Sequence, residues 1–255
     1  MSRDRPLTAR SVIASTLLGS EPPRLPSRRL VQAGALFGLA EGTVRVALSR
    51  MVKAGELHNV DGSYELAGDL VSRQRRQRES LLGERRPWRG SWRLAVVVAE
   101  ARSAGERLDL RRAMRTLRLA ERREGVWARP DNLDPRRFGA ERAVIDSQCE
   151  WYEAEVADDA ALAGALWDLD GWAREAQALR ERMDGLIGRL EDDDRRALAP
   201  GFVLAAGVLR HVQADPLLPS DLEPAGWPGS ELRLDYDRYD GAFRSVLRGW
   251  FLEWE

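Results

Sequence analysis

Residues 42–66 read GTVRVALSRMVKAGELHNVDGSYEL, and this stretch decides the fold of the amino-terminal part of the chain. At about 100° per residue, Val44, Ala47, Leu48 and Met51 fall on one apolar stripe. The pattern predicts an amphipathic helix that packs this stripe against a core. The remaining face of the helix then points to solvent.

Both ends of this helix have suitable terminal residues. Thr43 can serve as the N-cap, because its hydroxyl can accept a hydrogen bond from a free amide of the first turn. Gly55 can end the helix, since glycine readily takes the left-handed conformation found at helix ends. We therefore expect the helix to run between these two residues.

The outward face of the predicted helix carries Arg45, Val46, Ser49, Arg50 and Lys53, and no acidic residue. Cations can reach phosphates or guanine edges, and a small apolar side chain can touch a thymine methyl group. The face is therefore typical of a recognition helix that lies in the major groove of DNA, with Thr43 as a further contact at its start.

A hairpin is predicted directly after the helix. Glu56–Val60 and Ser63–Leu66 are two short strands around Asp61-Gly62, a pair that supplies the positive φ angles of a type I′ turn. The hairpin residues expected near the DNA backbone are His58, Asn59 and Ser63. Helix and hairpin together indicate the DNA-reading part of a winged helix-turn-helix.

The segments upstream fit the same interpretation. Residues 10–19 read as a first helix, residues 21–26 as a loop, and residues 27–38 as the positioning helix, with residues 39–42 as the turn. Arg28 and Arg29 at the start of the positioning helix are further candidate DNA contacts. The alternative interpretation is a small helical module whose basic face is simply solvated.

Composition bounds the class of protein. The chain has 255 residues, nine Trp and 44% hydrophobic residues, enough for a sizeable core. No apolar run approaches the length of a membrane helix, about 20 residues. No long apolar segment follows Arg3, Asp4 and Arg5, so we expect no secretion signal. The single Cys149 excludes an internal disulfide and a zinc finger. We therefore expect a cytoplasmic protein that does not contact the membrane.

Charge is distributed unevenly along the chain. Residues 1–93 hold 17 Lys and Arg against 9 Asp and Glu, and the remainder holds 23 against 32. A basic head on an acidic body is typical of a DNA reader attached to a regulatory or assembly body. The helix predicted at residues 70–83 is crowded with arginines, and it either follows the phosphate backbone or is a solvated connection.

The rest of the chain divides into two further parts, so the fold class is α+β. The expected domains are a winged helix-turn-helix at residues 1–69, a basic linker helix at 70–87, a ferredoxin-like domain at 88–166 and a helical domain at 167–255. The prediction of a ferredoxin-like domain is based on the order strand, helix, strand, strand, helix, expected at residues 91–99, 108–120, 125–129, 142–149 and 160–167. Further helices are predicted at residues 170–190, 201–214 and 239–254.

Enzyme chemistry has little support in the sequence. The two histidines, His58 and His211, cannot form a common metal site, and Cys149 has no evident base partner. The acidic triplet at residues 192–194 is interpreted as a solvated loop. We expect no catalytic residue, no metal ion and no bound cofactor.

One helix face could hold a ligand. By their three- and four-residue spacing, Arg111, Arg115, Arg118 and Arg122 share a face that could hold phosphates, although a solvated face is the preferred explanation. Trp127 and Trp172 could stack on an aromatic ligand or belong to the core. No effector-binding residue is assigned from the sequence.

Several segments together resemble the PaaX family of bacterial repressors. They are GTVRVALSRMVKAGEL with GSYEL, WRGSWRLAVVVAE, GVWARP, LWDL and DPLLPSDLEPAGWPG. The resemblance implies the three-part architecture and a homodimeric repressor of aromatic catabolism genes on a pseudo-palindromic operator in double-stranded DNA. It also implies release by an acyl- or aryl-CoA thioester such as phenylacetyl-CoA. The DNA contacts that carry over are Arg45, Ser49, Arg50 and Lys53.

The sequence also departs from the family pattern. The stretch at residues 119–124 is charged and free of glycine, and the helix after LWDL has no aromatic residue beyond Trp172. The central domain resembles a small nuclease whose first strand ends in a metal-binding Asp, whereas here Val98-Ala99 is followed by Glu100. We therefore predict no nuclease activity. The alternative functions are an interaction or structural module with a basic head, or a residual metal-dependent nuclease, and an activator role also stays open.

Overall fold

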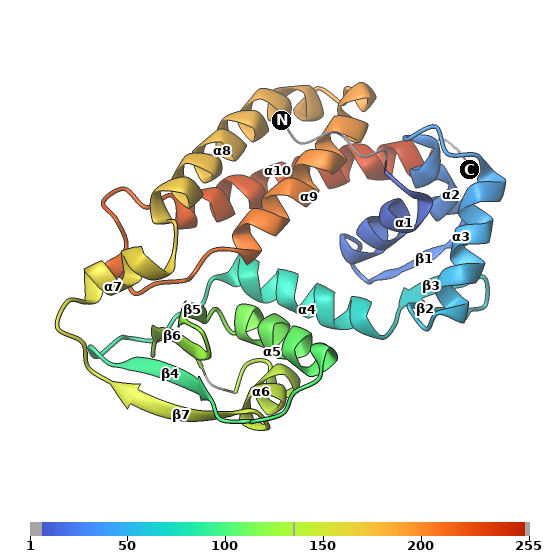
Figure 1. Cartoon of the computed structure of the whole chain (residues 1–255). Helices are drawn as coiled ribbons and strands as arrows, with labels where there is room; N and C mark the ends of the chain where they lie inside the picture. The colour runs from blue at the N-terminus through green and yellow to red at the C-terminus, as the bar shows by residue number, and fades with distance from the viewer. Residues whose placement is uncertain (1–6, 135, 253–255) are drawn as a thin grey trace. The chain divides into compact units, whose positions relative to one another are not determined.

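The computed structural model describes residues 7–134 and 136–252 and is mixed α+β, with two small antiparallel sheets (Figure 1). The helices are α1 (Ala9–Leu18), α2 (Ser27–Ala35), α3 (Glu41–Lys53), α4 (Asp69–Leu82), α5 (Ala104–Thr116), α6 (Gly139–Asp146), α7 (Asp159–Leu166), α8 (Leu169–Glu191), α9 (Leu198–Gln213) and α10 (Gly229–Leu252), with short 3-10 turns η1 (Arg195–Ala197) and η2 (Ser220–Leu222). The strands are β1 (Arg24–Pro26), β2 (Leu57–Val60), β3 (Ser63–Leu66), β4 (Trp92–Val97), β5 (Ala120–Arg123), β6 (Val126–Pro130) and β7 (Cys149–Ala154).

The chain forms two compact units. Unit 1 comprises Met1–Arg78, Leu179–Leu209 and Leu234–Glu255, and unit 2 comprises Glu79–Ala178 and Arg210–Arg233. Four helices, α4, α8, α9 and α10, contribute residues to both units. The four-part division at residues 69, 87 and 166 stays a prediction.

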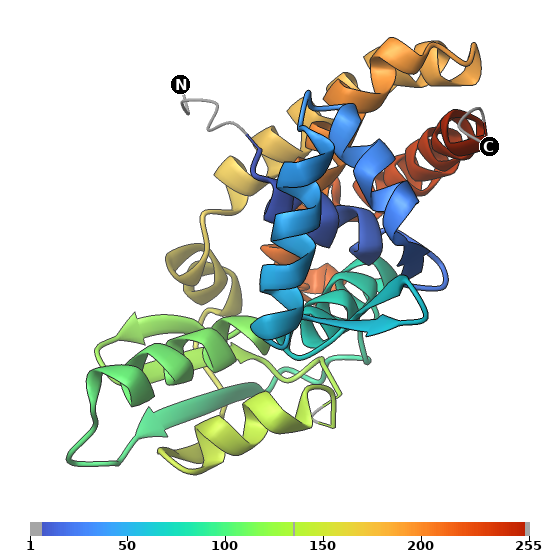
Figure 2. The ribbon, with the colours of Figure 1, turned by 90° about the vertical axis from the view of Figure 1, so that its right-hand side faces the viewer.

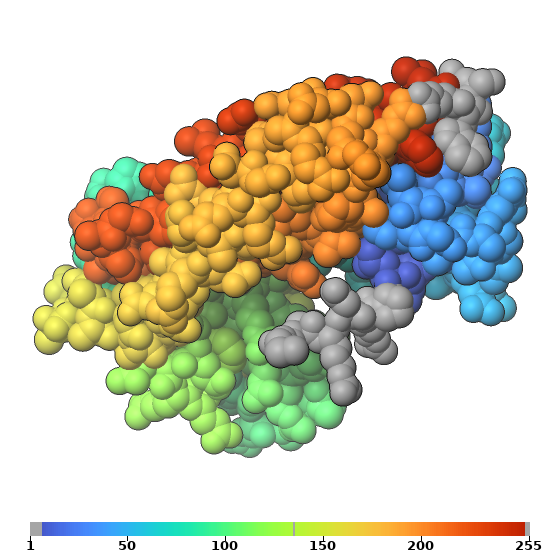
Figure 3. Space-filling model, turned by 90° about the horizontal axis from the view of Figure 1, so that it is seen from above, coloured from blue at the N-terminus to red at the C-terminus, as the bar shows by residue number. Residues whose placement is uncertain are grey.

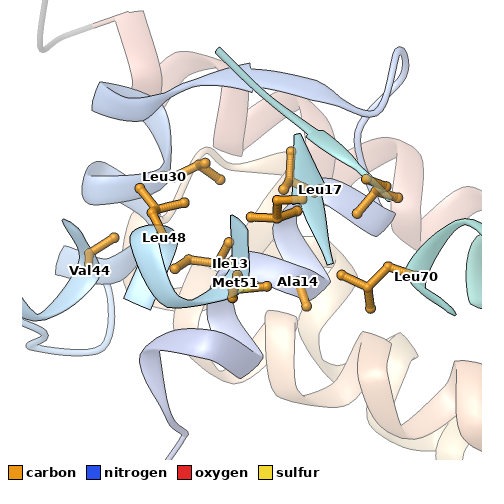
Figure 4. Close-up of a cluster of buried hydrophobic side chains, with 10 residues drawn as sticks. Ile13, Ala14, Leu17, Leu30, Val44, Leu48, Met51 and Leu70 are labelled. Carbon is orange, nitrogen blue, oxygen red and sulfur yellow. The ribbon is translucent and has the colours of Figure 1, made fainter. Parts of the chain in front are cut away.

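Unit 1 begins with the head (residues 7–70), which contains α1, α2, α3 and a sheet with the strand order β1-β3-β2. The three helices and the sheet enclose one apolar core around Ile13, Leu17, Leu30 and Leu48 (Figure 4). Val44, Leu48 and Met51 are each at most 2% exposed, so the predicted apolar stripe of the third helix is confirmed. Burial of this stripe fixes which side of α3 faces solvent.

The start of α3 differs from the prediction. The helix begins at Glu41 after Ala40, which has an extended backbone and no side-chain cap, and Thr43 lies inside the helix rather than at its N-cap. Glu41 therefore belongs to the first turn, where a carboxylate is favourable because of the partial positive charge of the helix N-terminus. The other end agrees with the prediction, since Gly55 follows the C-cap with a φ of 70°.

The hairpin agrees with the sequence pattern, and the loop before it does not. Asp61 and Gly62 have φ angles of 51° and 79°, as a type I′ turn requires, and Val60 pairs with Ser63. The segment expected to be only a loop contains β1, in which Leu25 pairs with Tyr64 of β3. A three-residue edge strand is held by backbone pairing, so its side chains carry no pattern that predicts it.

Helices α9 and α10 contact the head through their residues in unit 1. Val12 and Ala33 of the head form a second apolar cluster with Phe251 of α10, and the rings of Phe37 and Phe202 meet edge to face at 5.1 Å. Within unit 1, Leu179, Met183, Ile187 and Leu190 form the buried stripe of α8. The outward side chains of α8 cover part of the surface in Figure 3.

The late helices start earlier than predicted. Helix α9 begins at Leu198 rather than at residue 201, and α10 begins at Gly229 rather than at residue 239. The predicted end of the last helix at Trp254 lies outside the described residues. Among the described helices, none combines the length and the apolarity needed to cross a membrane.

Unit 2 contains a four-stranded antiparallel sheet with the strand order β5-β6-β4-β7, and its elements follow the order β4, α5, β5, β6, α6, β7. Ala95 and Trp127 face a core with α5 and α6, which includes Met114 and Ile145. Trp92 and Ala128 face the opposite side, against α7 and the segment around Leu218. Both faces of the sheet are thus covered.

One predicted element of unit 2 is wrong, and the bounds of another are shifted. The strand expected at residues 142–149 is the helix α6 followed by the start of β7, because Ile145 is buried as the inward residue of a helical turn. The helix expected at residues 108–120 begins at Ala104 with a capping box between Ser103 and Glu106, and it ends at Thr116. The charged stretch Ala120–Arg123 is the edge strand β5.

Candidate nucleic-acid interface

The solvent-facing side of α3 gathers most of the predicted contact residues. Thr43, Arg45, Val46, Ser49, Arg50 and Lys53 are all exposed, and Val46 has 51% of its surface accessible. Figure 2 shows α3 at the front of the view, with the β2–β3 hairpin beside its carboxy-terminal end. The sequence thus places these six side chains on one accessible helix.

The cations are not equivalent on this face. At about 100° per residue, Val46, Ser49 and Lys53 lie opposite the buried stripe, whereas Arg50 and Arg45 lie on the two flanks. On its own flank, Arg45 donates a hydrogen bond from Nε to Oε1 of Glu41 at 2.7 Å. Glu41 belongs to the helix and not to the preceding turn, so an acidic side chain lies beside the outward face, next to Arg45.

A groove of about 620 Å³ runs along the Arg50 side of α3. Its walls include Thr8 and Arg10 from the start of α1, and Thr43, Val46 and Arg50 from α3. The Arg10 guanidinium donates to both carboxylate oxygens of Glu56, with Nη2 to Oε1 at 2.5 Å and Nε to Oε2 at 2.9 Å. Sequence reasoning missed Thr8 and Arg10, which no local pattern links to α3.

The hairpin residues fall into two classes. His58 and Asn59 are exposed, and the Asn59 Oδ1 accepts a hydrogen bond from the Gly62 amide at 3.1 Å, so this side chain supports the turn. Ser63 is half-buried opposite Val60 and Pro26. A cation that the sequence did not indicate, Arg24 of β1, donates to the Val60 carbonyl oxygen at 3.3 Å and pairs with Glu65 at 3.0 Å.

The two arginines of α2 also differ. Arg28 is exposed. Arg29 is half-buried, and its guanidinium carbon lies 5.0 Å from the centre of the Phe251 ring, a cation–π contact. Of the two, Arg28 is the more accessible to a phosphate.

The arginine row considered for phosphate binding is split by the fold. Arg118 lies beyond the end of α5 in a left-handed conformation, with a φ of 62°. Its guanidinium donates to Ser80 Oγ and the Asp215 carbonyl oxygen, both at 2.7 Å, and to the Gln213 carbonyl oxygen. Burial lowers the pKa of Arg118 to about 10. This side chain therefore ties the α5 end to the segment after α9 and has a structural role.

Arg129 has a similar structural role that the sequence did not indicate. Its guanidinium donates to Asn132 Oδ1 at 2.6 Å and to the Leu117 carbonyl oxygen at 3.1 Å, and burial lowers its pKa to about 9. Asn132 in turn donates to the Leu217 carbonyl oxygen at 2.9 Å. The buried side chains of Arg129 and Asn132 thus hold the DPLLP segment to the sheet. This contact is a physical reason for the presence of the motif.

Some of the remaining ligand candidates meet in unit 2. Arg115, Trp127, Trp167 and Arg210 line a groove of about 510 Å³. Trp172 lies elsewhere, between the ring of His211 and the ring of Trp227, each at a centroid distance of 4.5 Å. The structure therefore brings Arg115 and Trp127 together and separates Trp172 from them.

The groups considered for catalysis lie in surroundings that fit a structural role. Burial raises the pKa of the Cys149 thiol to about 11, which disfavours the reactive thiolate. In the acidic triplet, Asp194 accepts hydrogen bonds from Arg196 and Arg189, which lower its pKa to about 2. No group of three or more His, Cys, Asp or Glu side chains suited to a metal ion is found among the described residues.

Comparison with known proteins places the chain in a family. The family model described as PaaX-like protein matches residues 8–70, the same region as the head. The uncharacterized protein Rv0674 from Mycobacterium tuberculosis has a similar structure, with a TM-score of 0.67 and 38% sequence identity over 95% of this chain and 98% of that chain. No curated protein matches the sequence. From the match of the head, and the likeness of nearly the whole chain to Rv0674, the chain belongs to the PaaX-like protein family.

Proposed function

We propose that the protein is a sequence-specific DNA-binding transcriptional regulator. The observation that carries this proposal is the outward face of α3, where Arg50, Lys53 and Val46 are exposed above a fully buried apolar stripe. Rigid support matters because base recognition requires side chains in a fixed register on the duplex. Membership in the PaaX-like family supports the same function.

We infer that the head is a winged helix-turn-helix. In this arrangement α2 is the positioning helix, α3 the recognition helix, and the β2–β3 hairpin the wing beside the groove. We also infer that the sheet and helices of unit 2 form a ferredoxin-like domain, since the order β4, α5, β5, β6, α6, β7 is that of a split βαβ arrangement.

The proposed regulator is a homodimeric repressor. Two copies would place two α3 helices in successive major grooves, about one helical turn apart, on a pseudo-palindromic operator. Arg50 and Lys53 are the proposed principal contacts, because Arg45 already pairs with Glu41. Thr43, Ser49, Arg28, His58 and Asn59 are proposed to complete the interface.

The proposed effector is an acyl- or aryl-CoA thioester such as phenylacetyl-CoA. The groove of unit 2 supports this proposal, because Arg115 and Arg210 offer cations for phosphates and Trp127 and Trp167 offer flat apolar surface. We further propose that the protein does not cleave DNA.

A gel-shift experiment tests these proposals with the DNA upstream of the protein's own gene. Binding that resists nonspecific competitor DNA, and that aryl-CoA weakens, supports the ligand-responsive regulator. Absence of binding favours an interaction or structural module instead. Magnesium-dependent cutting of the probe favours a nuclease.

The variant Arg50→Ala tests whether α3 reads the operator. A bidentate contact to guanine contributes about 1–3 kcal/mol, so its loss should weaken operator binding by about 5- to 150-fold. The matched control is Arg111→Ala, which removes one exposed cation from α5 and should leave operator affinity nearly unchanged. Equal affinities of Arg50→Ala, Arg45→Ala and the wild type would reject α3 as the reader.

A further inference from the structure

The groove on the Arg50 side of α3 lies between two helices of the head. One wall is the start of α1, with Thr8 and Arg10, and the other is the flank of α3, with Thr43, Val46 and Arg50. Its volume is about 620 Å³. Because Val46 lies opposite the buried stripe of α3, the groove opens onto the face that is proposed to read bases.

A helix in the major groove of DNA has a sugar-phosphate strand along each of its flanks. An α-helix with its side chains is about 10–12 Å wide and the major groove is about 12 Å wide, so one helix fills the width of the major groove. Protein surface directly beside the helix then lies against the DNA backbone and not against base edges. On the Arg50 flank of α3, that surface is the groove.

The side chains in the groove fit a phosphate strand. The cations are Arg10 and Arg50, and the exposed Thr43 adds a hydroxyl. Arginine and threonine side chains are common donors to phosphate oxygens. Of the described residues that line the groove, only Glu56 carries a carboxylate, and it is paired with Arg10. The groove therefore carries a net positive charge.

The ion pair with Glu56 holds Arg10 at the groove without using up its donors. Arg10 donates through Nε and Nη2 to the Glu56 carboxylate, and 59% of the Arg10 side chain remains exposed. A guanidinium has five N–H donors on three nitrogens, and Nη1 of Arg10 makes no hydrogen bond within the described part of the chain. Arg10 can therefore donate to a second anion while Glu56 keeps it in place.

We propose that this groove seats one sugar-phosphate strand of the bound DNA, with Arg10 as a phosphate contact and Glu56 as the residue that positions it. The proposal rests on the proposed function and adds α1 to the elements that touch DNA. Arg10 contributes to the affinity for any duplex, since phosphates carry no base identity. Arg50, on the opposite wall, can reach base edges and contributes to specificity.

The salt dependence of DNA binding tests this assignment. For each phosphate contact, the logarithm of the affinity falls by about 0.9 for every tenfold rise in salt concentration. Loss of one contact should therefore lower the slope by about 0.9 and weaken binding by about 5- to 10-fold at roughly 0.1 M salt. The probes are the duplex from upstream of the protein's own gene and a mixed-sequence duplex of the same length. Both should lose the same factor.

Glu56→Gln is the reference protein, because removal of Arg10 alone would leave an unpaired carboxylate in the groove. Arg10→Gln added to this reference should produce the loss of slope and affinity on both duplexes. The matched control adds Arg238→Gln instead. Arg238 is likewise exposed and paired, with Glu191 at 2.9 Å, but it does not line the groove, so slope and affinity should stay unchanged.

Two results would overturn the proposal, provided that circular dichroism shows each variant to be folded. One is an unchanged slope and affinity when Arg10→Gln is added, and the other is a loss confined to the upstream duplex, which would make Arg10 a base reader. Failure of the wild type to bind either duplex refutes the proposed function, and this proposal with it. Equal wild-type affinity for both duplexes refutes only the sequence specificity, and the mixed-sequence duplex then decides the role of the groove.

Discussion

Gly34 controls how closely α2 packs against α3, the helix proposed to read DNA. A Cβ added at Gly34 would lie 2.6 Å from Cγ2 of Val44 and 3.6 Å from Cβ of Leu39. Carbon atoms normally pack at about 3.5–4.0 Å, so the first of these contacts is a clash. Val44 is fully buried, and its branched side chain has little freedom to rotate away. Gly34→Ala must therefore push the two helices apart.

The expected stability change combines two opposing effects. Overpacking a core costs about 1–3 kcal/mol, and replacing a helical glycine by alanine contributes about 1 kcal/mol of stability. We expect the net effect of Gly34→Ala to lower the free energy of unfolding by up to about 2 kcal/mol. The control Gly185→Ala, on an open face of α8, meets no atom within 4 Å and should raise stability by about 0.5–1 kcal/mol.

Urea unfolding followed by circular dichroism measures both changes, and operator affinity is measured under conditions where every variant is folded. Gly34→Ala should weaken operator binding as well, because α3 is displaced. Val44→Ala should relieve the clash, so the double variant should be less destabilised than the sum of the single variants by about 1 kcal/mol. If Gly34→Ala gained as much stability as Gly185→Ala, the inferred close packing of α2 and α3 would be wrong.

Two further predictions concern charge. Glu41→Gln should tighten DNA binding by about 2- to 5-fold at low salt, because it releases Arg45 from an exposed ion pair that contributes only about 0.5–1 kcal/mol. Unchanged or weaker binding in a salt titration would contradict this prediction. Burial lowers the pKa of His211 below its ordinary 6.5, so the unfolded chain takes up the proton first and stability should fall as pH drops below about 6.5. His211→Gln keeps a donor for the Trp172 carbonyl oxygen and should reduce this loss between pH 7.5 and 5.5, whereas the control His58→Gln should not.

The head was predictable because its signals are local. The apolar spacing of Val44, Leu48 and Met51 and the Asp61-Gly62 turn identify α3 and the hairpin without any knowledge of the rest of the chain. The exact start of α3 was not predictable, since Ala40 makes no side-chain cap and Thr43 is an equally plausible first residue by type. That difference of a few residues placed Glu41 in the first turn of α3, where it pairs with Arg45.

The edge strands and α6 required the tertiary structure. Strands β1 and β5 are held by backbone pairing at sheet edges, and the side chains of Ala120–Arg123 are mostly exposed and charged. Residues 142–149 contain too few apolar side chains to separate a strand from a helix. Packing against the core buries Ile145, and this burial selects the helix α6 over a strand.

The sequence by itself determined the helix, the hairpin and the family resemblance, because these depend on residues close together in the chain. The tertiary structure decided which distant side chains meet. It brought Arg10 to Glu56 beside α3 and placed Arg115 and Arg210 in the wall of one groove. Such contacts arise from the packing of whole helices and sheets, and no local periodicity encodes them.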